Sequence, residues 1–179
     1  MIIRWSRMKK QLESRLCDSL KGRVSYNNTR YRGTHDQEGR AWVTFDNVII
    51  HDFCTINREY KFNTLAYNIR SENDCLDYRK PEQKDGYWKA YREADQEMIN
   101  QGIYSQYEFY NAVQDYLNLS IEDGISSEDP IIRAISMFDY RFGRRRLLEI
   151  EADTDFVVNK FLKIRLEAEG LFKDEGSFA

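Results

Sequence analysis

The chain has 179 residues, of which 41% are hydrophobic, and its aromatic residues are 12 Tyr, 10 Phe and 3 Trp. This composition excludes a disordered chain and is sufficient for the core of one domain or of two small ones. Charged residues make up 32% and the formal net charge is −3, so only a local basic patch, and not the overall charge, could bind nucleic acid.

The first predicted element is an amphipathic helix over residues 3–21. Its apolar residues recur at spacings of three and four and form one stripe, which we expect to lie in the core: Trp5, Met8, Leu12, Leu16 and Leu20. Gly22 stands where the C-cap glycine of such a helix is expected.

A β region is predicted next. The segment GRAWVTFDNVIIHDFC alternates apolar and polar residues, and Asp46–Asn47 can form the left-handed turn of a tight hairpin that leads into a strand over residues 48–54. The segment RVSYNNTRYR, residues 23–32, alternates more weakly and adds a third strand. We therefore expect a three-stranded antiparallel meander whose apolar face is covered by helices.

The remainder of the chain is predicted to be mainly helical. The polar residues 73–86, which include Pro81, are interpreted as a linker. Helices are expected over residues 56–69 and 87–100, from a capping box at Ser105 and Glu108, and after Asp153 or Thr154. The predicted class is α+β, with a helix and meander part (1–72), a linker (73–86) and a helical part (87–179), together forming one compact domain.

The segment SEDPIIRAISMFDYRFGRRRL, residues 127–147, combines an apolar helix with a basic run. Asp129 suits the N-cap and Pro130 the first turn, and Gly143 is expected to end the helix after a buried stripe that reaches Phe142. The arginines that follow would then lie at a helix C-terminus, where cations are favoured by about 0.3–1 kcal/mol each. Pairing with Glu149 and Glu151 would complete a purely structural interpretation.

The alternative interpretation is a surface that binds a partner. Arginine recognises carboxylate and phosphate groups, and an aromatic ring beside it can stack on a base or on a side chain. The candidate binding residues are Tyr140, Arg141, Arg144, Arg145 and Arg146. A second basic group lies on or near the predicted sheet: Arg23, Arg30, Arg32 and Arg40.

The sequence contains no catalytic signature and no cofactor motif, so no catalytic residue is assigned and no cofactor is expected. His35, Asp36 and Glu38 lie together in one polar loop, but their spacing matches no known metal site, so we expect no metal there. His51 and Cys54 are three residues apart on one strand, which places their side chains on opposite faces and argues against a nucleophile–base pair.

The N-terminus and the cysteines indicate a cytoplasmic protein. The segment MIIRWSRMKKQ lacks the apolar run of about 7–15 residues that a signal peptide needs, and no window approaches the roughly 18 apolar residues of a membrane span. Cys17, Cys54 and Cys75 are odd in number and fit no metal or redox spacing, so we expect reduced thiols. No membrane association is expected.

Two sequence blocks carry further information. Residues 4–24 contain a Trp-Ser start and the stretch Asp-Ser-Leu-x-Gly-Arg, and residues 115–147 contain a Pro-x-x-Arg-Ala helix that ends in a basic run. In this order the blocks resemble a family of small uncharacterised bacterial cytosolic proteins. Gly124 departs from the pattern, because a helix former would fit better there. The resemblance constrains the fold and implies no catalytic residues.

Three functional hypotheses remain open. The first is an intracellular protein-binding module, such as an immunity or antitoxin-like partner of a bacterial toxin, because arginine and aromatic residues dominate the energetics of protein interfaces. The alternative is a nucleic-acid-associated module that uses the 141–146 cluster and the sheet arginines. A weaker alternative is a small-molecule enzyme that uses His35 or His51. The oligomeric state is not predicted.

Overall fold

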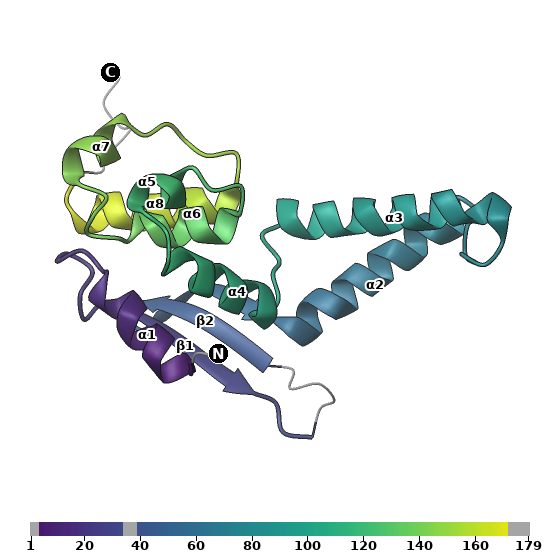
Figure 1. Cartoon of the computed structure of the whole chain (residues 1–179), viewed down its shortest axis with the longest axis horizontal. Helices are drawn as coiled ribbons and strands as arrows, with labels where there is room; N and C mark the ends of the chain where they lie inside the picture. Colours follow the sequence, from purple (N-terminus) through teal and green to yellow (C-terminus); the bar gives the residue numbers. More distant parts are fainter. Residues whose placement is uncertain (1–3, 34–38, 172–179) are drawn as a thin grey trace, which may run out of the picture. The chain divides into compact units, whose positions relative to one another are not determined.

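The computed structural model describes residues 4–33 and 39–171, and it confirms an α+β fold with an N-terminal helix, a three-stranded antiparallel sheet and C-terminal helices (Figure 1). The elements in chain order are α1 (Trp5–Ser14), β1 (Val24–Arg30), β2 (Gly39–Phe45), β3 (Val48–Cys54), α2 (Thr55–Glu72), α3 (Pro81–Asn100), α4 (Gln106–Tyr116), α5 (Ile121–Ile125), α6 (Pro130–Met137), α7 (Arg144–Glu149) and α8 (Phe156–Ala168).

The described residues divide into two compact units, each with its own internal contacts. Unit 1 contains residues 4–28, 42–51 and 109–171, and unit 2 contains residues 29–33, 39–41 and 52–108. The units therefore interleave along the chain, because strands of the sheet pass from one into the other. The division predicted from chain order, at residues 73–86, stays a prediction.

The sheet has the strand order β1-β2-β3 of a meander, as predicted. Asp46 and Asn47 both have positive φ, 47° and 65°, which is the backbone of a two-residue type I′ turn. One face of the sheet is apolar and buried, with Val24 and Tyr26 of β1 and Ala41 and Val43 of β2 at alternate positions, and the buried residues of β3 are Ile50, His51 and Phe53. The turn chemistry and the alternating pattern thus suffice to define this hairpin.

Helix α1 is shorter than the predicted helix over residues 3–21. Its stripe is buried as expected at Met8, Leu12, Leu16 and Leu20, but the helix ends at Ser14. Beyond it, the Cys17 amide donates to the carbonyl of Phe138 (3.0 Å), and the Tyr140 amide donates to the carbonyl of Arg15 (2.8 Å). A short antiparallel bridge to a distant segment thus replaces the last turns, and Gly22, with φ of 76°, lies in the turn before β1.

Helices α2 and α3 form an antiparallel hairpin within unit 2 (Figure 1). The segment predicted to be a linker up to residue 86 is helical from Pro81 onward, because proline is tolerated in the first turn of a helix. Gly86 is also explained by packing, since a Cβ atom there would lie 3.0 Å from the Cβ of Cys75. The buried core cluster of the hairpin is small. It contains Phe62, Ala66, Ala94 and Met98, with the partly buried Leu65, Ile69 and Ile103 packed against it.

Helix α6 begins at the predicted cap, whereas α8 begins after Asp155, whose side chain accepts the amides of Val157 and Val158 (2.7 and 3.1 Å), and not directly after Asp153 or Thr154 as expected. The Asp129 side chain accepts the amide of Ile131 (2.8 Å), and Pro130 follows it in the first turn of α6. Arg133 forms a bidentate ion pair with Asp153 (2.7 and 3.0 Å), which links α6 to the segment before α8. The two helices pack together, with the rings of Phe138 and Phe161 stacked at 4.6 Å.

The capping box predicted at residues 105–108 is confirmed. The Glu108 amide donates to the Ser105 hydroxyl (3.2 Å), and the Ser105 amide donates to the Glu108 carboxylate (2.6 Å).

Neither α2 nor α3, nor any other helix in the described part of the chain, combines the length and apolar character needed to cross a membrane.

Candidate functional site

The basic segment does not lie at the end of a long helix, so the prediction of a helix reaching Gly143 is wrong. Helix α6 ends at Met137, a turn follows, and α7 begins at Arg144 with Gly143 as its N-cap. The cause is Arg165 of α8, whose buried guanidinium donates to the carbonyls of Met137, Asp139 and Phe142 at 3.2–3.3 Å. These contacts hold the turn in place of further helix.

A buried carboxylate organises the same turn. The Asp139 side chain is fully buried and accepts hydrogen bonds from Arg141 Nε (2.9 Å), Arg141 Nη2 (2.6 Å) and the Tyr116 hydroxyl. Burial, together with the nearby charge of Asp139, raises the pKa of Tyr116 well above its ordinary value. The hydrogen bond that Arg141 donates to Asp139 raises the pKa of Arg141 above its ordinary value, so the guanidinium stays charged.

The five predicted binding residues therefore fall into two groups. Arg141 pairs with Asp139, and Arg146 pairs with Glu122 (2.9 Å) while its guanidinium lies over the ring of Phe142. The other three side chains reach solvent: Tyr140 is 57% exposed, Arg145 makes only an exposed pair with Glu149 (3.3 Å), and Arg144 is exposed at the start of α7.

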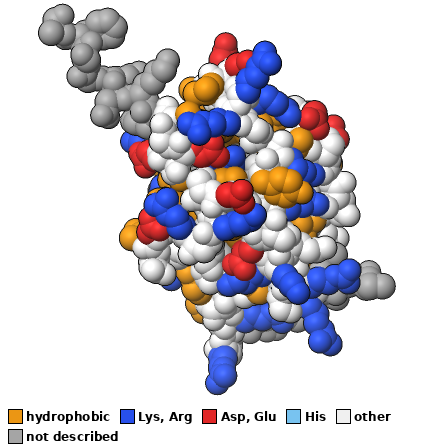
Figure 2. Space-filling model, turned by 90° about the vertical axis from the view of Figure 1, so that its left-hand side faces the viewer, with side chains coloured by type: hydrophobic (Ala, Val, Ile, Leu, Met, Phe, Trp, Pro, Cys, Tyr) orange, Lys and Arg blue, Asp and Glu red, His pale blue; other side chains and the backbone are white. Residues whose placement is uncertain are grey.

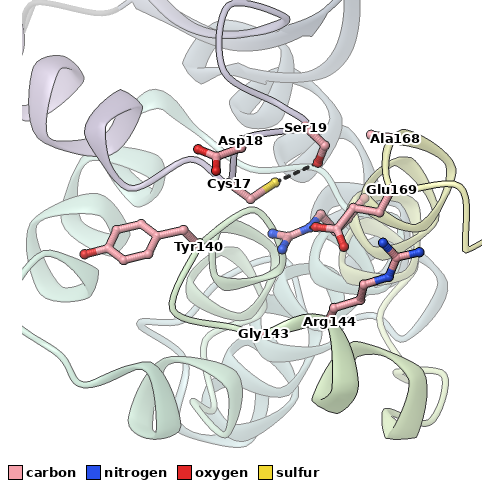
Figure 3. A pocket seen from close by; sticks show the side chains of 9 residues that line it. Cys17, Asp18, Ser19, Tyr140, Gly143, Arg144, Ala168 and Glu169 are labelled. Atoms are coloured by element: carbon pink, nitrogen blue, oxygen red, sulfur yellow. Dashed lines mark hydrogen bonds and ion pairs between the residues drawn. The ribbon is translucent and has the colours of Figure 1, made fainter.

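Tyr140 and Arg144 line an open depression of about 450 Å³ in unit 1 (Figure 3). Its walls come from segments far apart in the sequence, namely Cys17, Asp18 and Ser19, then Tyr140, Gly143 and Arg144, then Arg165, Ala168 and Glu169. In Figure 3 the Tyr140 side chain lies on one side of the depression with its ring pointing away from Arg144, whose guanidinium lies on the other side. Cys17 and Ser19, joined by a hydrogen bond between Sγ and Oγ (3.0 Å), lie between them.

Most charges that line this depression are neutralised within the protein. Asp18 pairs with Lys21 (2.7 Å), whose hydrogen bond lowers the pKa of Asp18, and Glu169 accepts from Arg165 Nε (2.5 Å). Arg144 is different, since within residues 4–33 and 39–171 it makes no hydrogen bond, ion pair or ring contact. One uncompensated cation therefore faces a depression bordered by an exposed aromatic ring.

Of the two histidines considered above, the structure describes His51 but not His35. The ring of His51 lies edge-on to Phe161 at 6.5 Å in a buried position, while His35, Asp36 and Glu38 lie outside the described residues. Across the part of the chain that the structure describes, no three His, Cys, Asp or Glu side chains are grouped so as to hold a metal ion. The three thiols are free, as expected.

The sheet arginines are partly engaged in ion pairs. Arg23 forms a bidentate pair with Asp46 (2.6 and 2.9 Å), and Arg40 does the same with Asp52 (2.7 and 2.9 Å). Arg30 and Arg32 are exposed. Figure 2 shows acidic and basic side chains intermingled over the upper part of one face and basic side chains gathered towards its lower edge.

A second surface, which the sequence reasoning missed, lies on unit 2. The rings of Tyr78, Tyr87, Trp88 and Tyr91 follow one another at centroid distances of 5.4–5.8 Å, and we call these four residues the aromatic strip. Its far end meets Phe62 (4.8 Å), and the guanidinium of Arg70 lies 3.7 Å above the centre of the Tyr87 ring. The close spacing of aromatic residues at positions 78, 87, 88 and 91 is the feature of the sequence from which this surface could have been predicted.

These features define a small α+β protein with an open, partly basic surface depression and an exposed row of aromatic rings. The chain belongs to the SF0329 protein family, whose sequence profile matches residues 4–166. Searches of curated proteins and of solved structures gave no significant match. The family match covers both units and supports the expectation of family membership.

Proposed function

We propose that the chain is a protein-binding module that receives an acidic side chain of its partner in the depression between Tyr140 and Arg144. The observation that carries this proposal is the unpaired Arg144 guanidinium. Arginine binds carboxylates through two parallel hydrogen bonds, and Arg with Tyr is the composition typical of energetically dominant interface residues.

The position of Arg144 adds a second argument. The first turn of α7 contains no acidic residue and begins with arginine, although the partial positive charge at a helix N-terminus disfavours cations. Arg145 and Arg146 have Glu149 and Glu122 to offset this cost, and Arg144 has no such partner among the described residues. A cation retained at an unfavourable place is better explained by binding than by stability.

Exposed apolar groups near Arg144 complete a surface of interface character. Tyr140 and Leu148 are both 57% exposed, and Leu148 is one helical turn beyond Arg144 on α7. A partner could therefore bury apolar contacts around the Arg144 ion pair, which would exclude water from it. The proposal includes a bacterial toxin as the partner, and identification of the bound protein tests this part.

The proposal is tested by placing a photo-crosslinking amino acid at position 140 in the host cell and identifying the captured protein. Binding of that purified protein is then measured by calorimetry. Arg144→Glu should weaken it by about 100-fold, because an interface charge reversal costs several kcal/mol. The matched control is Arg7→Glu, an exposed arginine of α1 in the same unit.

Three outcomes would contradict the proposal. The first is an equal loss of binding in the Arg144→Glu and Arg7→Glu variants. The second is capture at position 140 that survives Arg144→Glu unchanged. The third is capture of nucleic acid instead of protein, with binding that falls steeply with salt, which is the signature of the alternative function.

A further inference from the structure

The α2–α3 hairpin has a small buried core and several exposed aromatic side chains. Its two helices, of 18 and 20 residues, bury a core cluster of four side chains, of which Ala66 and Ala94 are two. Meanwhile Tyr78, Trp88 and Tyr91 of the aromatic strip are 46%, 42% and 41% exposed. Helical hairpins of this kind commonly complete their core by packing against a further pair of helices.

The charges beside the strip have a pattern that is complementary to itself. Lys84, Asp85, Arg92 and Asp95 stand three, four or seven residues from Trp88, so they lie on the same face of α3. When a second α3 is laid antiparallel across this face, Lys84 meets Asp95 of the second copy and Asp85 meets Arg92 of the second copy. The same arrangement sets Trp88 against Tyr91 of the second copy.

One twofold axis serves all three contacts to within one residue along α3. The midpoint of each pair, 84 with 95, 85 with 92 and 88 with 91, falls at residue 88.5 or 89.5 of α3. A symmetric dimer requires such self-complementarity, because the same patch must serve on both sides of the axis. Lys84, Asp85 and Arg92 make no ion pair within the described part of the chain, whereas Asp95 is held by Arg58 (2.6 Å).

We propose that the aromatic strip is the interface between two copies of this chain, with the two α3 helices antiparallel. A fully buried aromatic side chain contributes about 150–250 Å², so rings exposed by 41–46% supply roughly 60–110 Å² each. Three of them supply roughly 180–330 Å² per copy, or about 360–660 Å² in the dimer, so with the flanking charged side chains the interface is of the small kind found in weak, transient association. We therefore expect a weak dimer, with a dissociation constant no tighter than about micromolar.

Sedimentation velocity of the full chain from about 1 to 100 μM tests this proposal, since that range spans a micromolar dissociation constant. The wild-type chain should pass from monomer to dimer across the range. Asp85→Arg places the new arginine opposite Arg92 of the second copy, and the twofold axis repeats this repulsive contact. The substitution should therefore weaken association at least tenfold. The double variant Asp85→Arg/Arg92→Asp exchanges the charges and should restore the dimer.

Two further variants separate this interface from a general effect of charge or folding. Trp88→Ala should leave the chain monomeric across the range, while circular dichroism confirms that each variant is folded. The matched control is Glu93→Arg, which makes the same charge change five residues beyond Trp88, on the far side of the helix. A monomeric wild-type chain, a dimer that survives both Asp85→Arg and Trp88→Ala, or equal weakening by Glu93→Arg would overturn the proposal.

Discussion

Replacing Asp139 by Asn removes the one charge that neutralises Arg141 inside the turn between α6 and α7. The carboxylate is fully buried and accepts from Arg141 through two nitrogen atoms at 2.6 and 2.9 Å, and it also accepts the Arg141 amide at 2.8 Å. In Asp139→Asn the amide group must turn its NH₂ towards at least one of these donors. The guanidinium then stays beside a neutral, poorly oriented group.

The expected cost follows from the burial of the pair. Removing one partner of a buried ion pair costs about 3–5 kcal/mol, and because the Arg141 side chain is 26% exposed we take the lower end, about 3 kcal/mol. For a chain of this length, each kcal/mol shifts the melting temperature by about 2–4 °C. Asp139→Asn should therefore lower the midpoint by about 6–12 °C in differential scanning calorimetry.

The matched control is the same substitution at Asp18, whose side chain is 95% exposed and pairs with Lys21 on the surface. Exposed pairs of this kind contribute little to stability, so Asp18→Asn should leave the melting temperature unchanged. If both substitutions shift the midpoint equally, or if Asp139→Asn has no effect, the assignment of Asp139 as the centre of the turn is refuted.

Further expected outcomes concern pH, packing and α7. Burial opposes ionisation of Asp153, but the Arg133 hydrogen bond, the Asp155 amide and the charge of Arg133 together outweigh it and lower the pKa of Asp153. The resulting stabilisation is present above pH 3.8 and is lost as the pH falls through the lower folded value. Asp153→Asn should therefore remove this loss from the acid limb of a curve of melting temperature against pH. Burial raises the pKa of Tyr116, so stability should fall as the pH rises above 10.0, less steeply in Tyr116→Phe, as followed by circular dichroism. Gly124→Ala should destabilise by about 1–3 kcal/mol in urea titrations, because the new Cβ atom would lie 2.5 Å from Ser136 Oγ, and Gly124→Ala/Ser136→Ala should recover most of the loss. Arg144→Ala should leave stability unchanged or raise it by about 0.3–1 kcal/mol in the same titrations, because it removes a cation from a helix N-terminus.

Features set by neighbouring residues were predictable from the sequence, and features set by distant contacts were not. The Asp46–Asn47 turn, the Ser105–Glu108 capping box and the Asp129 cap each depend on a few consecutive residues, and all three are present. The end of α6 depends on Arg165, which lies 28 residues beyond Met137 and donates to its carbonyl. No local pattern could indicate that contact.

The candidate sites show the same division. Composition alone indicated that Tyr140 and the neighbouring arginines form a surface, but which arginine lacks a partner depends on the positions of Asp139, Glu122 and Glu149. The aromatic strip was missed because the residues around Pro81 and Gly86 indicated a linker. Proline in a first helical turn and glycine at a close helix contact are both compatible with helix, so these residues mark packing here and not a break.

The arginine-rich segment combines structural and surface roles within six residues. The two roles differ in how each arginine affects the free energy of folding. Arg141 is bound to the buried carboxylate of Asp139 and stabilises the turn, so its replacement should lower the stability of the fold, whereas Arg146 pairs with the exposed Glu122. Arg144 is bound to nothing among the described residues and lies where the helix disfavours it, so its replacement should be harmless or stabilising. Residues that lower stability are retained where binding requires them, which is why a variant of Arg144 that folds better yet binds worse would be the clearest sign of function.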